Sequence, residues 1–234
     1  MAELQNKTKT FCIIPAFNEE KNIIRVVKEV LPLVSEVVVV DDASTDQTSA
    51  LLKKLQVENQ IGKLTILKHA INRHQGASLQ TGNEYAISKG AEIIVHFDAD
   101  GQFLASEIKD LTEPIERDEA DVVLGSRFLE KKSQIPHFKK YIIFPLARLV
   151  NRILMGVNLS DPQSGFRALS RSSAEKITIK QGRSAHCSEI LSKIFEYKLR
   201  VREVPITVIY EDFGQRFSGG IRIIKDLLLG KIID

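Results

Sequence analysis

The sequence contains few cysteines and no apolar run long enough to span a membrane. Only two cysteines, Cys12 and Cys187, occur among 234 residues, and they lack the spacing of a metal-binding pair. The chain therefore does not resemble a disulfide-stapled secreted domain, and a reducing cytoplasm fits it. No run reaches the roughly 20 apolar residues of a spanning helix. Residues 1–7 carry no apolar signal segment, so we expect a cytoplasmic protein that can lie on a membrane but does not cross one.

A strong charge of one sign is also lacking. The net charge is +3, from 33 basic and 30 acidic residues, which is too weak to indicate a nucleic-acid partner. Dinucleotide-binding domains carry a Gly-x-Gly-x-x-Gly turn after their first strand, and here Pro15–Glu20 (Pro-Ala-Phe-Asn-Glu-Glu) stands in its place. These absences disfavour nucleic-acid binding and a dinucleotide-dependent enzyme of the usual kind.

Apolar runs alternate with segments of helical spacing along the first half of the chain. The strand candidates are Phe11–Ile14, Val37–Val40, Leu64–Leu67, Ile93–Phe97 and Val122–Leu124, with Val201–Tyr210 further on. Runs that are continuously apolar are typical of strands buried on both faces. We therefore predict an α/β fold with a mostly parallel sheet and helices on both faces. We expect residues 1–234 to form a single catalytic domain that is long enough for one packed core.

Acidic residues follow two of the predicted strands directly. Asp41 and Asp42 come after one run, and Asp98 and Asp100 come after another. Open α/β sheets bind ligands at the carboxyl ends of their strands. Two close carboxylates repel each other, and Mg²⁺ or Mn²⁺ with oxygen ligands would relieve that repulsion. The alternatives are a solvated acidic turn for the second pair and a helix-capping turn for the first.

The second half of the chain changes in character after Ser126. Basic residues are interleaved with apolar ones between residues 131 and 154, and residues 221–234 form a second, shorter amphipathic pattern. One interpretation is a helix packed on the sheet with a solvated rim. The other is an element that lies on a membrane surface, where basic amphipathic helices are common.

Seven segments, taken in order, resemble one enzyme family. They are Pro15–Glu20, Val39–Asp46, Asn72–Gly82, Asp98–Gln102, Gly125–Arg127, Asp161–Arg167 and Glu203–Ile206. The pattern, which extends over residues 11–217, is similar to the family-2 inverting glycosyltransferases with the Rossmann-like glycosyltransferase A fold. Within that family it most resembles the dolichyl- or polyprenyl-phosphate sugar synthases, a group that includes dolichol-phosphate mannose synthases. The resemblance implies inverting, metal-dependent transfer of a hexosyl group from a nucleotide sugar, GDP-mannose or a UDP-sugar, to a dolichyl or polyprenyl phosphate.

The resemblance also implies roles for residues on the donor side. Residues 10–128 would form the half that binds the nucleotide sugar. The expected nucleotide-sugar-binding residues are Pro15, Phe17, Glu19, Val39, Asp41, Gly76, Asp98, Ala99 and Asp100. Asp98, Asp100 and Gln102 would hold the Mg²⁺ or Mn²⁺ ion. Asp41 would accept a hydrogen bond from uracil or guanine alike, so the donor nucleotide stays open.

On the acceptor side, residues 129–234 would form a second half that includes the amphipathic segments. The resemblance places Arg127, Arg167 and Lys140 at the acceptor phosphate, and it gives catalytic roles to Asp100, Arg127 and Asp161. The alternative for Arg127 is an ordinary pair with a nearby carboxylate. A lipid acceptor implies peripheral association with the cytoplasmic face of a membrane.

Two segments depart from the family pattern. The family often has Gly-Lys-Gly where this chain has His74-Gln75-Gly76, and we expect His74 to be an exposed turn residue rather than a catalytic base. Near the C-terminus, Arg216 could replace an arginine that family members have at an earlier position in the chain. Three alternatives therefore stay open: a hydroxyl acceptor with Asp161 as general base, a nucleotidyltransferase, and a non-catalytic nucleotide-sugar-binding protein.

Overall fold

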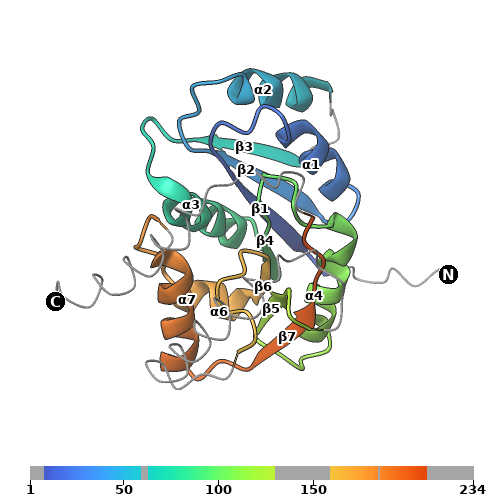
Figure 1. Cartoon of the computed structure of the whole chain (residues 1–234), viewed down its shortest axis with the longest axis vertical. Coiled ribbons are helices and arrows are strands. Elements are labelled where there is room, and N and C mark those ends of the chain that lie inside the picture. Colours follow the sequence, from blue (N-terminus) through green and yellow to red (C-terminus); the bar gives the residue numbers. More distant parts are fainter. Residues whose placement is uncertain (1–7, 59–62, 130–158, 184, 210–234) are drawn as a thin grey trace.

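A seven-stranded sheet forms the centre of the computed structural model, which describes residues 8–58, 63–129, 159–183 and 185–209. The strand order is β3-β2-β1-β4-β6-β5-β7 (Figure 1). The strands are β1 (Thr10–Ala16), β2 (Glu36–Asp41), β3 (Leu64–Lys68), β4 (Ile93–His96), β5 (Val122–Ser126), β6 (Arg167–Ser170) and β7 (Val201–Pro205). Each strand predicted from the sequence is thus present, although the last one ends at Pro205 rather than Tyr210.

The sheet is mostly parallel, as predicted, with one reversed strand. Strands β3, β2, β1 and β4 run parallel to one another, and β7 runs parallel to β5. Strand β6 is antiparallel to both of its neighbours, so that Arg167 pairs with His96 of β4 and with Leu124 of β5. The reversal brings the loop before β6 to the sheet edge where β4 and β5 end. The carboxyl ends of the other strands therefore share their edge with that loop.

Helices cover both faces of the sheet, which confirms the predicted layering (Figure 1). One face carries α1 (Ile23–Val30), α2 (Thr48–Glu58), the short η1 (Ala105–Glu107) and α4 (Ile108–Glu116). The other face carries α3 (His74–Ser88), α6 (Arg171–Lys176) and α7 (Ala185–Glu196).

Successive residues of a strand point to opposite faces, so each central strand feeds two cores. Ile14 of β1 packs in the core beneath α1, α2 and α4, whereas Ile13 packs in the core beneath α3, α6 and α7. Val39 and Val38 of β2 divide in the same way. This two-sided burial explains why the strands are continuously apolar in sequence.

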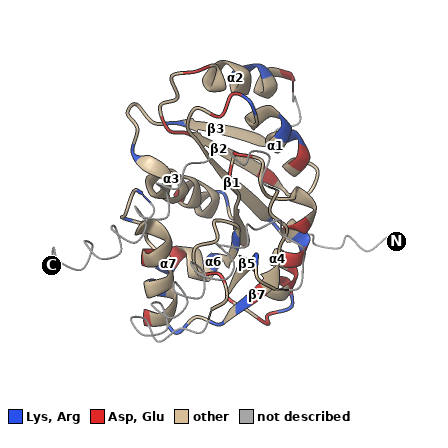
Figure 2. Ribbon diagram, in the orientation of Figure 1, with Lys and Arg blue, Asp and Glu red and all other residues tan. Residues whose placement is uncertain are grey.

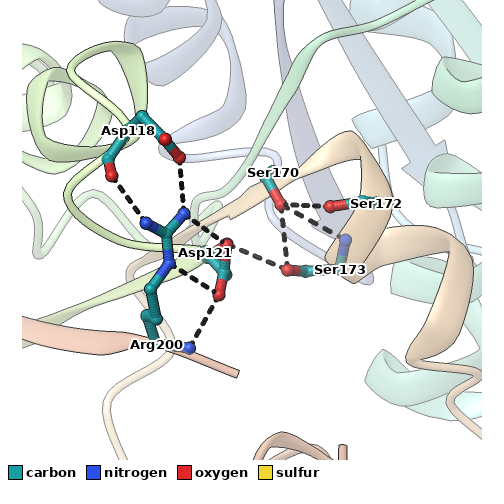
Figure 3. Close-up of polar contacts among 6 residues, drawn as sticks. All are labelled: Asp118, Asp121, Ser170, Ser172, Ser173 and Arg200. Atoms are coloured by element: carbon teal, nitrogen blue, oxygen red, sulfur yellow. Dashed lines mark hydrogen bonds and ion pairs between the residues drawn. The ribbon is translucent and has the colours of Figure 1, made fainter. Parts of the chain in front are cut away.

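Arg200 ties together the ends of several elements just before β7 (Figure 3). Its guanidinium donates to the Asp121 carboxylate from Nε at 3.1 Å and from Nη2 at 2.9 Å, and also to the Asp118 carboxylate at 2.5 Å. The Asp121 carbonyl accepts from Ser173 Oγ at 3.1 Å. These contacts join the start of β5, the start of β7 and α6. Because ion pairs between exposed side chains add little to stability, we expect these contacts mainly to align the three elements.

The amphipathic segments expected at residues 131–154 and 221–234 lie outside the described residues. Within the described ranges, no helix is both long and apolar enough to cross a membrane. Basic and acidic residues are mixed along the outer helices α1 and α4 (Figure 2).

Candidate active site

The carboxyl ends of three neighbouring strands meet at Asp41. It lies in register with Ala16 of β1 and Lys68 of β3, and only 1% of it is exposed. One carboxylate oxygen accepts from the Ser44 N–H at 2.9 Å, and the other accepts from Ser49 Oγ and lies 3.7 Å from Lys68 Nζ. Burial alone would raise the pKa of Asp41, but the hydrogen bonds from the two serines and the charge of Lys68 lower it overall. Asp41 is therefore a carboxylate acceptor at neutral pH.

A pocket of about 380 Å³ opens beside Asp41. It is lined by Ala43, Ser44, Lys68, His69 and Ala70. Two of these residues, Ser44 and Lys68, also contact the Asp41 carboxylate. Phe17 follows β1 in the chain and is 44% exposed, which is unusual for a large aromatic residue. The region thus offers a carboxylate acceptor, an ammonium donor and an exposed ring.

Asn18, for which the sequence predicted no role, joins the turns after β1 and β2. Its φ is +57°, a backbone conformation that asparagine tolerates better than most residues. Its side-chain oxygen accepts from the Thr45 N–H at 2.8 Å, while the Glu19 N–H donates to Thr48 Oγ1 at 2.9 Å. Burial, followed by the Asp100 carboxylate, raises the pKa of Glu19. Glu19 therefore lies within electrostatic range of the second acidic pair.

Asp42 holds the turn that leads into α3. Its Oδ1 lies 2.6 Å from His69 Nδ1 and accepts from the Arg73 N–H at 2.9 Å. The other ring nitrogen of His69 lies 3.0 Å from Thr81 Oγ1. The residue that accepts from the first turn of α2 is Asp46, through the Thr48 N–H at 2.9 Å. Asp42 thus organises the loop between β3 and α3 rather than capping α2.

The second acidic pair follows β4 directly. Burial and the nearby Asp100 carboxylate raise the pKa of Asp98 to about 6, against the lowering effect of Arg167. Burial also raises the pKa of Asp100, although the Gln102 N–H donates to its Oδ1 at 3.0 Å. Gln75, predicted only to depart from the family pattern, donates from Nε2 to Asp98 Oδ1 at 2.8 Å. Burial is thus the main cause of both raised pKa values, and the Asp100 carboxylate adds to it at Asp98.

Two carboxylates with raised pKa values fit a hard divalent cation. No group of three or more His, Cys, Asp or Glu side chains suited to a metal occurs in the described part of the chain. Mg²⁺ is typically held by one or two carboxylates together with substrate phosphates, so Asp98 and Asp100 would suffice as protein ligands. The backbone of Gln102 contacts Asp100, and a metal contact from the Gln102 side chain stays a prediction.

The loop before β6 lies directly against this acidic pair. A Cβ added to Gly165 would lie 2.6 Å from Asp98 Oδ2, so the backbone approaches the carboxylate closely. Arg167 is 1% exposed, and its Nη2 donates to the Ser164 carbonyl at 2.7 Å and to Cys187 Sγ at 3.2 Å. These contacts direct Arg167 into the protein, beneath Asp98. Its expected role at the acceptor phosphate stays a prediction.

The other end of the same loop contacts Arg127. Asp161 Oδ2 accepts from Arg127 Nε at 2.6 Å and from its N–H at 3.1 Å, while Oδ1 accepts from Nη2 at 2.7 Å. The Arg127 side chain is 20% exposed, whereas that of Asp161 is 2% exposed. The pairing with a nearby carboxylate, the alternative expectation for Arg127, is therefore present. It leaves part of Arg127 accessible and buries Asp161.

The other residues predicted to bind the nucleotide sugar are buried. Pro15, Val39 and Ala99 are buried in or next to the strands. Gly76 is buried where the start of α3 packs on the Gln181 carbonyl. His74 is exposed, as expected, and has φ of +68°, but it is the first residue of α3 rather than part of a turn. The predicted residues Lys140 and Arg216 lie outside the described residues.

Comparison with known proteins identifies the family of this chain. The family model described as Glycosyl transferase family 2 matches residues 11–178. The chain is 34% identical to a UDP-N-acetylglucosamine–dolichyl-phosphate N-acetylglucosaminyltransferase of Methanococcus voltae, over 96% of this chain and 98% of that protein. It is 27% identical to a polyprenol monophosphomannose synthase of Mycolicibacterium smegmatis, over 95% of this chain and 85% of the relative.

The fold is similar to that of a solved glycosyltransferase structure. A mannosyltransferase from Pyrobaculum calidifontis, in complex with GDP-Man and Mn²⁺, superposes with a TM-score of 0.60 at 20% identity. The match covers 94% of this chain and 61% of the neighbour. The family match, which spans more than half of the chain, shows that this protein belongs to glycosyl transferase family 2.

Proposed function

We propose that this enzyme transfers a hexosyl group from a nucleotide sugar to a dolichyl or other polyprenyl phosphate, with inversion at the anomeric carbon. Relatives similar over nearly the whole chain are named for dolichyl- and polyprenyl-phosphate substrates. The observation that carries the proposal is the loop of residues 161–167. It contacts the cation Arg127 at one end and the carboxylate of Asp98 at the other.

The proposed donor side is the region around Asp41. A base with an N–H group next to a carbonyl could donate to Asp41 and accept from Lys68, and its ring could stack on the exposed Phe17. Uracil and guanine both have this arrangement, whereas adenine and cytosine lack the ring N–H. We therefore propose a UDP-sugar or GDP-mannose as donor.

The diphosphate would lie at Asp98 and Asp100. These two residues would hold Mg²⁺ or Mn²⁺, which when bound offsets the negative charge that grows on the leaving nucleoside diphosphate. Gln75, which stands at the position of the lysine in the family pattern, provides a hydrogen-bond donor to Asp98. The departure at residues 74–76 thus preserves a polar contact, which favours an active enzyme over a non-catalytic binding protein.

The proposed acceptor chemistry needs a cation rather than a base. A phosphate monoester is largely dianionic at neutral pH, so its oxygen can attack the anomeric carbon while the bond to the diphosphate breaks. Arg127 would position that phosphate through its fixed fork of N–H donors. A hydroxyl acceptor would instead require Asp161 to take a proton. Asp161 is buried and accepts three hydrogen bonds from Arg127, which favours the phosphate.

The proposal is tested by incubating the protein with radiolabelled nucleotide sugars and a polyprenyl phosphate in the presence of Mg²⁺ or Mn²⁺. We expect labelled lipid with at least one donor, and none from an Asp98→Ala variant. Label on a sugar hydroxyl, or a nucleotide attached to the product, would contradict the proposal. Peripheral membrane attachment through the amphipathic segments, and the division into a donor half (10–128) and an acceptor half (129–234), belong to the same proposal. Binding to anionic liposomes at low salt tests the attachment.

A further inference from the structure

We infer that Glu203 is a positioning residue for the acceptor, acting through Asp161 and Arg127. This inference rests on the proposed function, because it assumes that Arg127 meets the acceptor phosphate. Glu203 belongs to β7, in register with Leu124 of β5, two residues before β5 ends. Arg127 follows the end of β5 directly, so Glu203 and Arg127 occupy the same corner of the sheet.

Glu203 holds the beginning of the loop that carries Asp161. Its two oxygens both accept from the Ser160 N–H at 2.9 Å. Its Oε1 also accepts from Ser160 Oγ at 2.8 Å and from the Asp161 N–H at 3.0 Å. The carboxylate thus fixes two consecutive backbone N–H groups, which determines where the Asp161 side chain emerges.

Ser126 provides a second attachment for the same loop. Its Oγ lies 2.5 Å from Ser160 Oγ and accepts from the Phe128 N–H at 3.1 Å. Ser126 is fully buried at the last position of β5. The loop is therefore anchored to β7 through Glu203 and to β5 through Ser126.

Asp161 connects the anchored loop to the side chain of Arg127. Its carboxylate contacts one edge of the guanidinium, through Nε and Nη2, and also the Arg127 backbone N–H. A paired contact of this kind fixes the plane of the guanidinium as well as its position. Asp161 consequently orients the guanidinium of Arg127. Glu203 holds Asp161 in place and does not itself touch the acceptor.

The neighbouring residue Arg202 offers a matched control. It precedes Glu203 in β7, so its side chain points to the opposite face of the sheet, where it pairs with Glu119. An Arg202→Gln variant changes the charge of the same strand without touching the loop of Asp161. Any general effect of altering β7 should appear in both variants.

The test is a set of acceptor kinetics with a polyprenyl phosphate, using Glu203→Ala, Glu203→Gln and the control. We expect Glu203→Ala to lower kcat/KM for the acceptor by about tenfold to a hundredfold, as for the loss of hydrogen bonds to a charged group. Glutamine keeps one acceptor oxygen for the two N–H groups, so Glu203→Gln should lose less and should fold even if Glu203→Ala does not. The donor KM and the Arg202→Gln kinetics should stay unchanged.

A double-mutant cycle distinguishes positioning from a general structural role. If Glu203 acts only through Arg127, then Glu203→Gln should have no further effect in an Arg127→Ala background. Independent, multiplying effects of the two substitutions, or wild-type acceptor kinetics for both Glu203 variants, would overturn the inference.

A measurement that does not depend on transfer separates this inference from the proposed function. Exchange of the Arg127 Nε–H with solvent, followed by ¹H–¹⁵N NMR, reports whether Asp161 still holds the guanidinium. We expect faster exchange in Glu203→Gln than in the wild type. Absence of transfer to any polyprenyl phosphate by the wild type would overturn the proposed function. Unchanged exchange in Glu203→Gln would overturn the positioning role itself.

Discussion

Gly165 lies so close to Asp98 that a Cβ at this position would be 2.6 Å from the carboxylate oxygen Oδ2. The loop before β6 therefore forms one wall around the proposed metal-binding carboxylate. A side chain on residue 165 must displace either that loop or Asp98 itself. The contact links the acidic pair after β4 to the loop that carries Asp161.

Substitution Gly165→Ala should impair metal-dependent activity more than it impairs folding. Because small displacements of reacting groups are costly, we expect activity to fall by about a hundredfold. The matched control is Gly90→Ala. Gly90 has φ of +78°, and an added Cβ would make only ordinary contacts with the ends of Lys9 and Arg171, so its substitution should lower the melting temperature but leave the metal dependence unchanged. Equal activity losses in the two variants would indicate that Gly165 matters only for stability.

The raised pKa of Asp98 predicts that pH and metal act together on stability. The folded-state pKa of about 6 lies above the ordinary value near 4, so the folded chain binds more protons between these values. Stability of the metal-free protein should therefore decline as the pH rises through this window. A bound cation requires the carboxylate form, so Mn²⁺ should raise the Tm more at about pH 7.5 than at about pH 5.

Thermal melts with and without Mn²⁺ at the two pH values measure this coupling. Asp98→Asn should remove the stabilisation by Mn²⁺, whereas Glu116→Gln, on the exposed side of α4, should retain it. A Mn²⁺ effect of equal size at both pH values would contradict the assignment of Asp98 as a ligand.

Asp41→Asn should weaken nucleotide binding, because an amide offers one acceptor oxygen where the carboxylate offers two. The loss of a hydrogen bond to a charged group predicts about a tenfold rise in Kd for UDP or GDP, whichever binds. Titration calorimetry in the presence of Mn²⁺ measures it. Asp118→Asn, which alters a carboxylate near Arg200 instead, should bind nucleotide like the wild type. Wild-type affinity in Asp41→Asn would remove this residue from the base site.

An Arg167→Gln variant distinguishes two roles for Arg167: a cation that acts on Asp98 from beneath, and a direct contact with the acceptor. The charge of Arg167 lowers the pKa of Asp98, so its loss should raise that pKa further and shift Mn²⁺ binding to higher pH. Arg167→Lys keeps the charge and should shift the binding less. If the acceptor KM rises while the pH dependence of Mn²⁺ binding stays constant, Arg167 contacts the acceptor directly.

Much of the donor side could be predicted from the sequence because the relevant residues directly follow apolar runs. Continuous apolar runs before Asp41 and Asp98 predict buried parallel strands, and the carboxyl ends of parallel strands share one edge of the sheet. Strand β7 ends at Pro205, earlier than expected, because proline has no N–H group to donate to a neighbouring strand.

The acceptor side was harder to predict because its contacts join residues far apart in sequence. Strand β6 has four residues, too few for a pattern to reveal that it runs antiparallel to its neighbours. That reversal brings Gly165 to Asp98 and Asp161 to Arg127, which lies 34 residues earlier in the chain. The role of Gln75 was missed for a related reason. Its neighbour Asp98 becomes adjacent only when α3 packs against the end of β4.

The most direct test of the account is ³¹P and ¹H NMR of the lipid product formed by the wild-type enzyme from nucleotide sugar and polyprenyl phosphate with Mn²⁺. We predict that the phosphomonoester signal of the acceptor is replaced by that of a phosphodiester, with the anomeric configuration of the sugar inverted. An unchanged phosphomonoester signal, with the sugar attached to a hydroxyl group or released to water, would contradict the proposed reaction.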